Sequence, residues 1–314
     1  MQKKRTIRRR LTQALLFLLS QLSLRHAHAL ASGAAWCLWR CKALPARTAA
    51  INVALCLPEL TPGEQTQLVR DSLAENGKAI FELGPLWRWP LDKVLAVIED
   101  GDGVAELRAA VQRQRGVIVI APHLGSWEAL GPALSRIAPM TAMFTPGRMG
   151  VDDPVRGARE RAGARLVPGN RHGVMALART LSKGGMICVL PDQDPGRGGG
   201  IFAPFFGIET YTMKLLSRLA MRSSARGFVV WCERLPEGRG FAMHCRAAPE
   251  ALCEGPLERS VAALNHAVET EVRRAPAQYL WSYKRFRSRP DGGAGPYPRR
   301  AARRNAEASV PRSR

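Results

Sequence analysis

The sequence predicts an α/β fold in which helices flank a mixed, largely parallel sheet. Two short β-branched runs, residues 116–121 (GVIVIA) and 186–190 (MICVL), are typical of strands buried on both faces. Stretches with helical spacing of apolar residues separate such runs, which favours alternating strands and helices. Of the 314 residues, 46% are apolar and 23% are charged, so the chain can bury a full core.

The remaining elements follow in chain order. Residues 48–84 have a helical pattern that Pro58 and Pro62 interrupt with a turn, and residues 91–113 suggest a second helix. A loop and then a helix are expected over 123–137, and a loop over the glycine-rich residues 195–200. Further strands are expected at 141–144, 166–167, 227–233 and 241–246, and further helices at 154–164, 172–182, 211–221 and 257–274.

The first forty residues combine a basic start with an apolar stretch. Six of the first ten residues are Lys or Arg, and residues 11–24 carry no charge. An uncleaved, shallowly inserted helix with its positive end in the cytoplasm is the preferred interpretation. The alternative is a secretory signal cleaved near residues 27–29 (Ala-His-Ala). We therefore expect a membrane-associated N-terminal helix over 1–40, the main domain over 41–290 and a disordered basic tail over 291–314.

The net charge of +21 predicts an anionic partner. The two ends supply +6 and +4, which leaves +11 on residues 11–290. Phospholipid headgroups, an acidic carrier protein and nucleic acid all fit this charge. The seven cysteines form no CxxC pair, and we expect Cys188 and Cys232 to be core residues in a reducing compartment.

His123 and Glu128 are the candidate catalytic pair. His123 leaves the first buried strand, and Gly125-Ser126 offers a bend and an N-cap before a helix that would carry Glu128. A carboxylate that holds one ring nitrogen leaves the other free to act as a general base. Such a pair can take a proton from an alcohol that attacks a thioester. A His and a Glu that only cap the helix are the alternative.

His266 and Glu271 have the same spacing and serve as an internal control. On a continuous helix, residues five apart point about 140° away from each other. We therefore expect this second pair to lie apart, on solvated helix surface. No Gly-x-Ser-x-Gly segment is present, so a serine acyl-enzyme has no support.

The chain resembles the acyltransferases that add secondary acyl chains to lipid A, within the lysophospholipid acyltransferase class. That class uses a His-x-x-x-x-Asp/Glu motif, and this subgroup has Glu. Five blocks in the expected order carry the resemblance: residues 52–60 (NVALCLPEL), 121–130 (APHLGSWEAL), 190–196 (LPDQDPG), 200–207 (GIFAPFFG) and 277–290 (AQYLWSYKRFRSRP).

The resemblance implies an inner-membrane enzyme, active on the cytoplasmic face, that uses acyl carrier protein as donor and a lipid A precursor as acceptor. No cofactor or metal is implied. Arg165 is the expected contact to a lipid or carrier phosphate. Thr145-Pro146 stands where the family has Arg-Pro, and Arg148 is the candidate to replace that arginine.

Asp192 and Asp194 follow the second buried strand and leave an alternative open. Paired carboxylates bind hard cations, as in a metal-dependent glycosyltransferase. Because no third ligand or nucleotide loop is recognisable, we expect Asp192 instead to support the floor of the site. The second alternative is a non-enzymatic basic protein. Basic and aromatic residues alternate in residues 281–289, which suits a membrane interface, and no nucleic-acid partner is expected.

Overall fold

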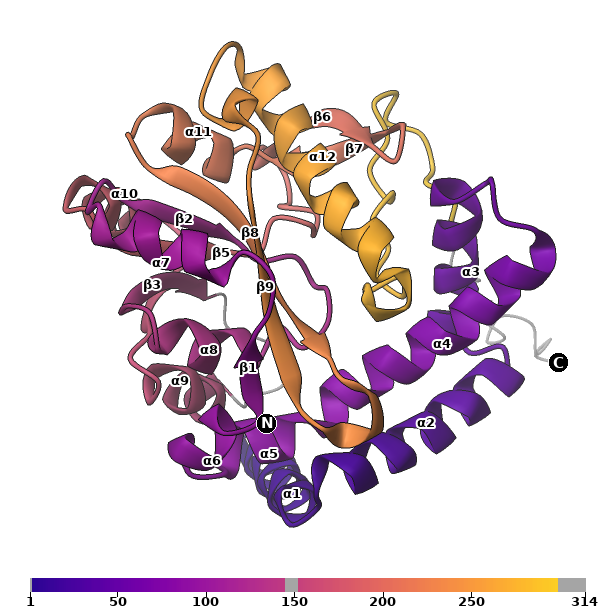
Figure 1. Ribbon diagram of the computed structural model, residues 1–314. Coiled ribbons are helices and arrows are strands. Elements are labelled where there is room, and N and C mark those ends of the chain that lie inside the picture. Colours follow the sequence, from indigo (N-terminus) through magenta and orange to yellow (C-terminus); the bar gives the residue numbers. More distant parts are fainter. Residues whose placement is uncertain (1, 145–151, 299–314) are drawn as a thin grey trace, which may run out of the picture.

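A computed structural model describes residues 2–144 and 152–298, and within these ranges the chain forms a seven-stranded sheet covered by helices on both faces (Figure 1). The strand order is β1-β9-β8-β2-β5-β3-β4. Only β8 and β9 pair antiparallel, and the other neighbours pair parallel. The predicted α/β class with a mixed, largely parallel sheet is confirmed.

The strands of this sheet are short, and the central ones are apolar on both faces. Every residue of β2 and β5 is buried, as their β-branched sequences predicted. The bounds are β1 Ile98–Asp100, β2 Val117–Ile120, β3 Met140–Phe144, β4 Arg165–Pro168, β5 Met186–Val189, β8 Arg226–Arg234 and β9 Phe241–Ala247. A separate antiparallel hairpin consists of β6 Gly200–Phe205 and β7 Ile208–Met213.

The alternation of side chains along β2 divides the core into two layers. Ile118 and Ile120 face a cluster that includes residues of α3, α4, α10, α11 and α12. Val117 and Val119 face a second cluster that includes residues of α5 to α8. The helices are α1 Gln2–Ser20, α2 Leu24–Arg40, α3 Leu44–Cys56, α4 Pro62–Phe81, α5 Leu83–Arg88, α6 Leu91–Leu95, α7 Val104–Gln112, α8 Leu130–Ser135, α9 Asp152–Glu160, α10 Arg171–Ser182, α11 Leu215–Met221 and α12 Leu257–Arg274. Short 3₁₀ turns occupy Pro236–Gly238, Glu250–Leu252 and Pro276–Gln278.

Three sequence-based assignments are wrong. The helix predicted over 91–113 is divided into α6, β1 and α7, because Gly103 adopts φ +75° before α7 and the intervening residues pair with β9. Part of the helix predicted over 211–221 belongs to β7. The hairpin β6–β7 was not predicted; the expected loop covered only residues 195–200, and the expected helix began at residue 211.

The N-terminal region forms two helices joined at residues 21–23. Ser23 caps α2 by accepting a hydrogen bond from the backbone N–H of His26. Ala27, Ala31 and Ala35 are buried along one side of α2, where Gly77 of α4 lies so close that a Cβ there would be 3.2 Å from the Ala31 oxygen. Within the described residues, no helix has the length and apolar character needed to cross a bilayer.

Candidate active site

The segment from Pro122 to Glu128 follows the carboxyl end of β2 and is held by backbone contacts on two sides. Gly125 adopts φ +64°, and a Cβ at this position would be 2.0 Å from the Cys232 carbonyl oxygen of β8. The Gly125 N–H donates to the Gln278 oxygen at 3.0 Å, and the Ser126 N–H donates to the Cys232 oxygen at 2.8 Å. Only glycine fits this close approach with a positive φ. The backbone that presents His123 is therefore fixed in place.

Asp192 is the partner of His123. One carboxylate oxygen accepts from the His123 backbone N–H at 2.8 Å, and the other lies 2.8 Å from His123 Nδ1. Burial disfavours the charged carboxylate, but the interaction with His123 outweighs burial and lowers the pKa of Asp192. Because an ionised carboxylate only accepts, Nδ1 carries the proton and Nε2 has the lone pair that a base needs.

The second ring nitrogen of His123 faces Gln193. The amide Nε2 of Gln193 lies 3.1 Å from His123 Nε2, so the amide donates to the lone pair. Trp127 packs beside the ring at a centroid distance of 5.3 Å. The imidazole is thus held on three sides, and its side chain keeps 14% of its area exposed.

Glu128 pairs with Arg159 instead of His123. Arg159 donates to the Glu128 carboxylate through Nη2 at 2.5 Å and through Nε at 3.1 Å, and the Trp87 indole N–H donates to it at 3.0 Å. Glu128 raises the pKa of Arg159 although burial acts in the opposite direction. Among the described residues, no hydrogen bond joins His123 to Glu128.

The predicted local geometry around Glu128 needs a correction. Glu128 lies in a turn before α8, and α8 begins at Leu130 without a side-chain cap. Ser126 does not cap this helix, because its hydroxyl donates to Glu82 at 2.9 Å. The expectation that Glu128 orients the imidazole is not met in this structure, since Asp192 occupies that position.

A second polar cluster lies buried behind the segment. Glu82 accepts from Arg234 Nε at 2.5 Å and lies 2.6 Å from His28 Nε2. Burial alone would raise the pKa of Glu82, but the Arg234 charge and the His28 hydrogen bond hold it at about 2. Arg234 also donates to Glu75 at 2.7 Å. This cluster joins α2, α4 and β8 to the Ser126 hydroxyl.

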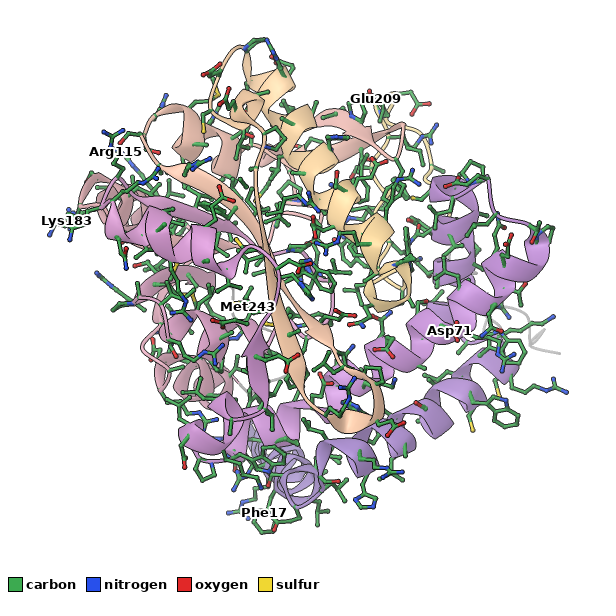
Figure 2. All side chains as sticks on the ribbon, in the orientation of Figure 1. Phe17, Asp71, Arg115, Lys183, Glu209 and Met243 are labelled. Carbon is green, nitrogen blue, oxygen red and sulfur yellow. The ribbon has the colours of Figure 1, made fainter. Side chains whose placement is uncertain are left out.

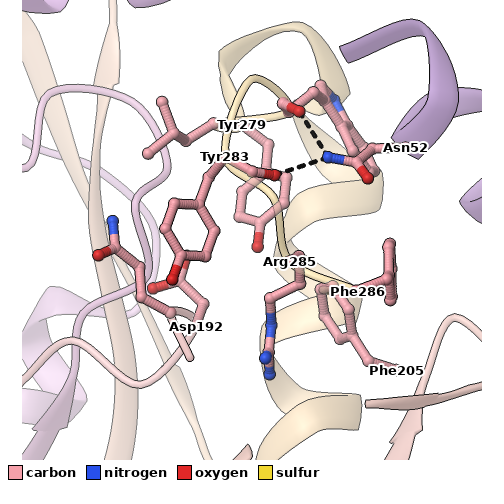
Figure 3. A pocket seen from close by; sticks show the side chains of 10 residues that line it. Asn52, Asp192, Phe205, Tyr279, Tyr283, Arg285 and Phe286 are labelled. Carbon is pink, nitrogen blue, oxygen red and sulfur yellow. Dashed lines mark hydrogen bonds between the residues drawn. The ribbon is translucent and has the colours of Figure 1, made fainter. Parts of the chain in front are cut away.

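Asp192 borders a small cavity of about 10 Å³ (Figure 3). Asn52 lies at one side and donates to the backbone oxygens of Trp281 and Tyr283, both at 2.7 Å. Arg285 is buried and donates to the Tyr211 oxygen at 2.6 Å, and its positive charge adds to the lowering of the Asp192 pKa. The block 277–290 therefore forms the wall behind the His123–Asp192 pair.

The other predicted residues have separate places. Asp194 pairs with Arg287 at 3.0 Å and accepts from Ser288 at 2.7 Å, so its carboxylate has different partners from that of Asp192. Arg165 is exposed at the start of the edge strand β4 and level with Ile187 of β5, so the structure does not bring it to His123. Arg148 lies outside the described residues.

Asp192 and Asp194 were also considered as possible metal ligands. Within the ranges 2–144 and 152–298, no group of three or more His, Cys, Asp or Glu side chains is arranged to hold a metal ion. Each of Asp192 and Asp194 is instead hydrogen bonded to protein groups.

The control pair behaves as expected except for the burial of Glu271. His266 is exposed on α12, as predicted. Glu271 is buried, contrary to the prediction, and accepts from the Trp231 indole and from Arg274, both at 3.0 Å. The two side chains point to different sides of the helix, as a five-residue spacing requires.

Sequence reasoning missed Arg159 and Gln193. Gln193 lies between the two aspartates that were examined, so its position next to the site could have been inferred. Arg159 is one of three arginines within residues 156–161, and nothing in that spacing marks it as the partner of Glu128.

Comparison with known proteins identifies the family of the chain. A family model described as "Bacterial lipid A biosynthesis acyltransferase" matches residues 2–288. The chain is 31% identical to the Escherichia coli (strain K12) lipid A biosynthesis palmitoleoyltransferase over 255 residues, covering 78% of this chain and 80% of the relative. It is 26% identical to the lauroyltransferase of the same strain over 246 residues, with 77% and 78% covered, and 28% identical to its myristoyltransferase over 260 residues, with 81% and 79% covered. The alternatives of a glycosyltransferase and of a non-enzymatic protein are superseded, because the chain belongs to the bacterial lipid A biosynthesis acyltransferase family.

Proposed function

We propose that the protein transfers a fatty acyl chain from acyl carrier protein to a hydroxyl group of a lipid A precursor, with His123 as the general base. The observation that carries this proposal is the pair of hydrogen bonds from His123 to Asp192, which leaves Nε2 as the basic nitrogen. Family membership supplies the reaction class. Asp192 takes the orienting role that Glu128 was expected to have.

In the proposed reaction, His123 Nε2 accepts the proton of the acceptor hydroxyl as its oxygen attacks the thioester carbonyl carbon. The tetrahedral intermediate then collapses, the C–S bond breaks, and the imidazolium returns a proton to the thiolate that leaves. Gln193 has to give up its hydrogen bond to Nε2 before the hydroxyl can occupy that position.

Arg159, held in place by Glu128, is proposed to supply the positive charge that the intermediate needs. Glu128 accepts hydrogen bonds from two of the three guanidinium nitrogens of Arg159, Nε and Nη2. A guanidinium has five N–H donors, so others are left for a ligand. The Arg159 side chain keeps 34% of its area exposed, which permits contact with a substrate. In this scheme Glu128 holds Arg159, and Arg159 stabilises the oxyanion.

The N-terminal helices are proposed to associate the enzyme with the cytoplasmic face of the inner membrane. Leu11, Leu15 and Leu18 recur at helical spacing on α1 and are 66%, 55% and 63% exposed. Phe17 also lies on the outer side of α1 (Figure 2). Exposed apolar residues beside basic ones suit a helix that lies in the interface. Sedimentation of the full chain with anionic vesicles, and an intact N-terminus in the purified protein, would test this assignment.

The donor assignment rests on charge and is tested by salt. Acyl carrier proteins are acidic, and residues 11–290 carry +11. Attraction should weaken as the Debye length falls from about 10 Å at 0.1 M salt to about 3 Å at 1 M. Transfer of one acyl chain from the carrier protein and from coenzyme A should be compared at low and high salt. We expect the carrier protein to be faster and to lose more of its rate; equal or faster transfer from coenzyme A at every ionic strength would contradict this donor.

The central experiment mixes the purified full chain with acyl–acyl carrier protein and a lipid A precursor. Mass spectrometry should find the acceptor heavier by one acyl group, in an ester bond. The His123→Ala protein should give no product above background. Wild-type protein that yields free fatty acid and no acylated lipid would contradict transfer to the hydroxyl.

A further inference from the structure

A basic pocket lies between the start of α3 and the C-terminal end of the described chain. It has a volume of about 980 Å³, and its lining includes Lys42, Arg47, Lys284 and Arg287, with Leu44 and Tyr297. No Asp or Glu is among the described residues that line it. Figure 1 shows α3 and the last described segment on the same side of the molecule. We refer to this cavity as the headgroup pocket.

The cations of the headgroup pocket have few partners of opposite charge. Among the described residues, no ion pair involves Lys42, Arg47 or Lys284. Arg47 Nε donates to the Lys42 backbone oxygen at 2.7 Å, and Lys284 Nζ lies 5.5 Å from the centre of the Tyr297 ring. Three like charges converge without compensation, an arrangement that an anionic ligand would stabilise.

Lys42 occupies a backbone position that usually takes glycine. Its φ is +48°, and the Ala43 N–H closes the end of α2 by donating to the Leu38 oxygen at 3.0 Å. A non-glycine residue in this conformation costs free energy. The presence of a lysine at this position, with its side chain on the pocket, favours a role for the charge.

Exposed apolar side chains lie close to Lys42 in the sequence. Leu44 lines the pocket and is 54% exposed, and Trp36 and Leu38, in the last turns of α2 before Lys42, are 55% and 45% exposed. Cations beside exposed apolar and aromatic side chains match the boundary between lipid headgroups and acyl chains.

Arg287 links the pocket to the loop next to the candidate active site. Arg287 lines the pocket and pairs with Asp194, whose backbone N–H donates to the Tyr283 hydroxyl at 3.0 Å. Gln193, the preceding residue, contacts His123 Nε2. An anionic group in the pocket would therefore sit beside the loop that carries the His123 contacts.

From these observations we infer that the headgroup pocket binds a phosphate or carboxylate group of the anionic lipid acceptor and holds the acceptor hydroxyl toward His123. This inference rests on the proposed function. The expected ligand is an oxyanion attached to a lipid, which Lys42, Arg47 and Lys284 would bind. A free phosphate ion or any anionic membrane lipid could offer the same oxyanion, so the test has to separate these sources.

The test variant is Lys42→Gln/Lys284→Gln in the full chain, and its matched control is Arg113→Gln/Lys183→Gln, which removes two exposed cations elsewhere. Figure 2 shows Lys183 on the opposite side of the molecule from α3. We expect the pocket variant to raise KM for the acceptor about tenfold or more, since two charged hydrogen-bond donors to the oxyanion are lost. The fall in kcat should be much smaller, and the control should keep the wild-type KM.

Two further measurements complete the design. Dephosphorylated acceptor should raise KM for the wild type and change the pocket variant little. Binding of labelled acceptor in detergent to His123→Ala protein, with and without the two pocket substitutions, gives a readout independent of turnover.

Competition by inorganic phosphate alone, or by phosphatidylglycerol vesicles as strongly as by acceptor, would overturn the assignment to the acceptor. An unchanged acceptor KM in the pocket variant would overturn the inference itself, whereas a wild type without any transfer would refute the proposed function.

Discussion

Two clusters of the same residue types involve the segment that carries His123. In one, His28, Glu82 and Arg234 have side chains that are 8%, 0% and 1% exposed. In the other, His123 with Asp192 and Arg159 with Glu128 keep 14% of the histidine and 34% of the arginine exposed. The enclosed cluster has its charges paired within the protein, whereas the open cluster leaves part of its histidine and arginine exposed. Enclosure, more than residue type, is the feature by which we assign a structural role to one cluster and propose a chemical role for the other.

The largest effect should come from the open cluster. His123→Ala should lower the transfer rate by about 10³-fold or more, because the general base is lost. Thermal unfolding should change little. His266→Ala, on exposed α12 surface, should retain near-wild-type turnover in the same assay. A His123→Ala protein that turns over at the wild-type rate would refute the mechanism.

The enclosed cluster should respond in stability. Arg234→Met leaves the buried Glu82 charge without its main partner, and we expect the free energy of unfolding to fall by about 3–5 kcal/mol. Urea unfolding followed by circular dichroism measures this change. Arg156→Met breaks the exposed Arg156–Glu160 pair and should cost less than about 1 kcal/mol. Equal losses of unfolding free energy in the two variants would show that the buried Arg234 contacts stabilise the protein no more than an exposed ion pair does.

The second pair of the open cluster is expected to affect rate with little loss of stability. Glu128→Ala or Arg159→Ala should lower kcat by about 10²-fold, because Arg159 would no longer be positioned at the developing oxyanion. Single-turnover kinetics measures the step. Arg159→Lys should recover part of the rate. If both alanine variants unfold as readily as Arg234→Met, the pair is structural.

The smallest expected effect is a loss of stability at low pH. The pKa of Glu82 is about 2 in the folded chain against an ordinary value of 4.5. A lowered pKa adds stability above pH 4.5 that is lost as the pH falls from 4.5 through 2. The free energy of unfolding should therefore decline over that range in the wild type and decline less steeply in Glu82→Gln. Parallel curves of unfolding free energy against pH for the two proteins would show that Glu82 does not cause the loss of stability in acid.

Periodicity and strand composition were enough to predict the sheet and most helices, because local patterns determine those elements. The run of residues 257–274 became α12, and both GVIVIA and MICVL became buried strands. The division of residues 91–113 was missed because β1 depends on β9, which lies more than 140 residues later in the chain.

His123, Glu128 and Asp192 were selected from their positions after buried strands together with the resemblance to the family motif, and their catalytic roles stay predictions. Their partners were not predicted, because Asp192 and Arg159 reach the segment from 69 and 31 residues away, and sequence spacing carries no record of that pairing. The burial of His28 was missed for the same reason, since Glu82 is 54 residues distant.

The backbone contacts of the His123 segment have a consequence for synthesis of the chain. Backbone N–H and C=O groups of this segment bond to Asp192, Cys232, Gln278 and Leu280, all of which leave the ribosome after it. Contacts so distant along the chain form late, because the intervening loop has to be closed first. A nascent chain that ends before residue 280 lacks part of this support. Termination before residue 280 should therefore yield inactive fragments, and acyl transfer should begin only after synthesis has passed that residue.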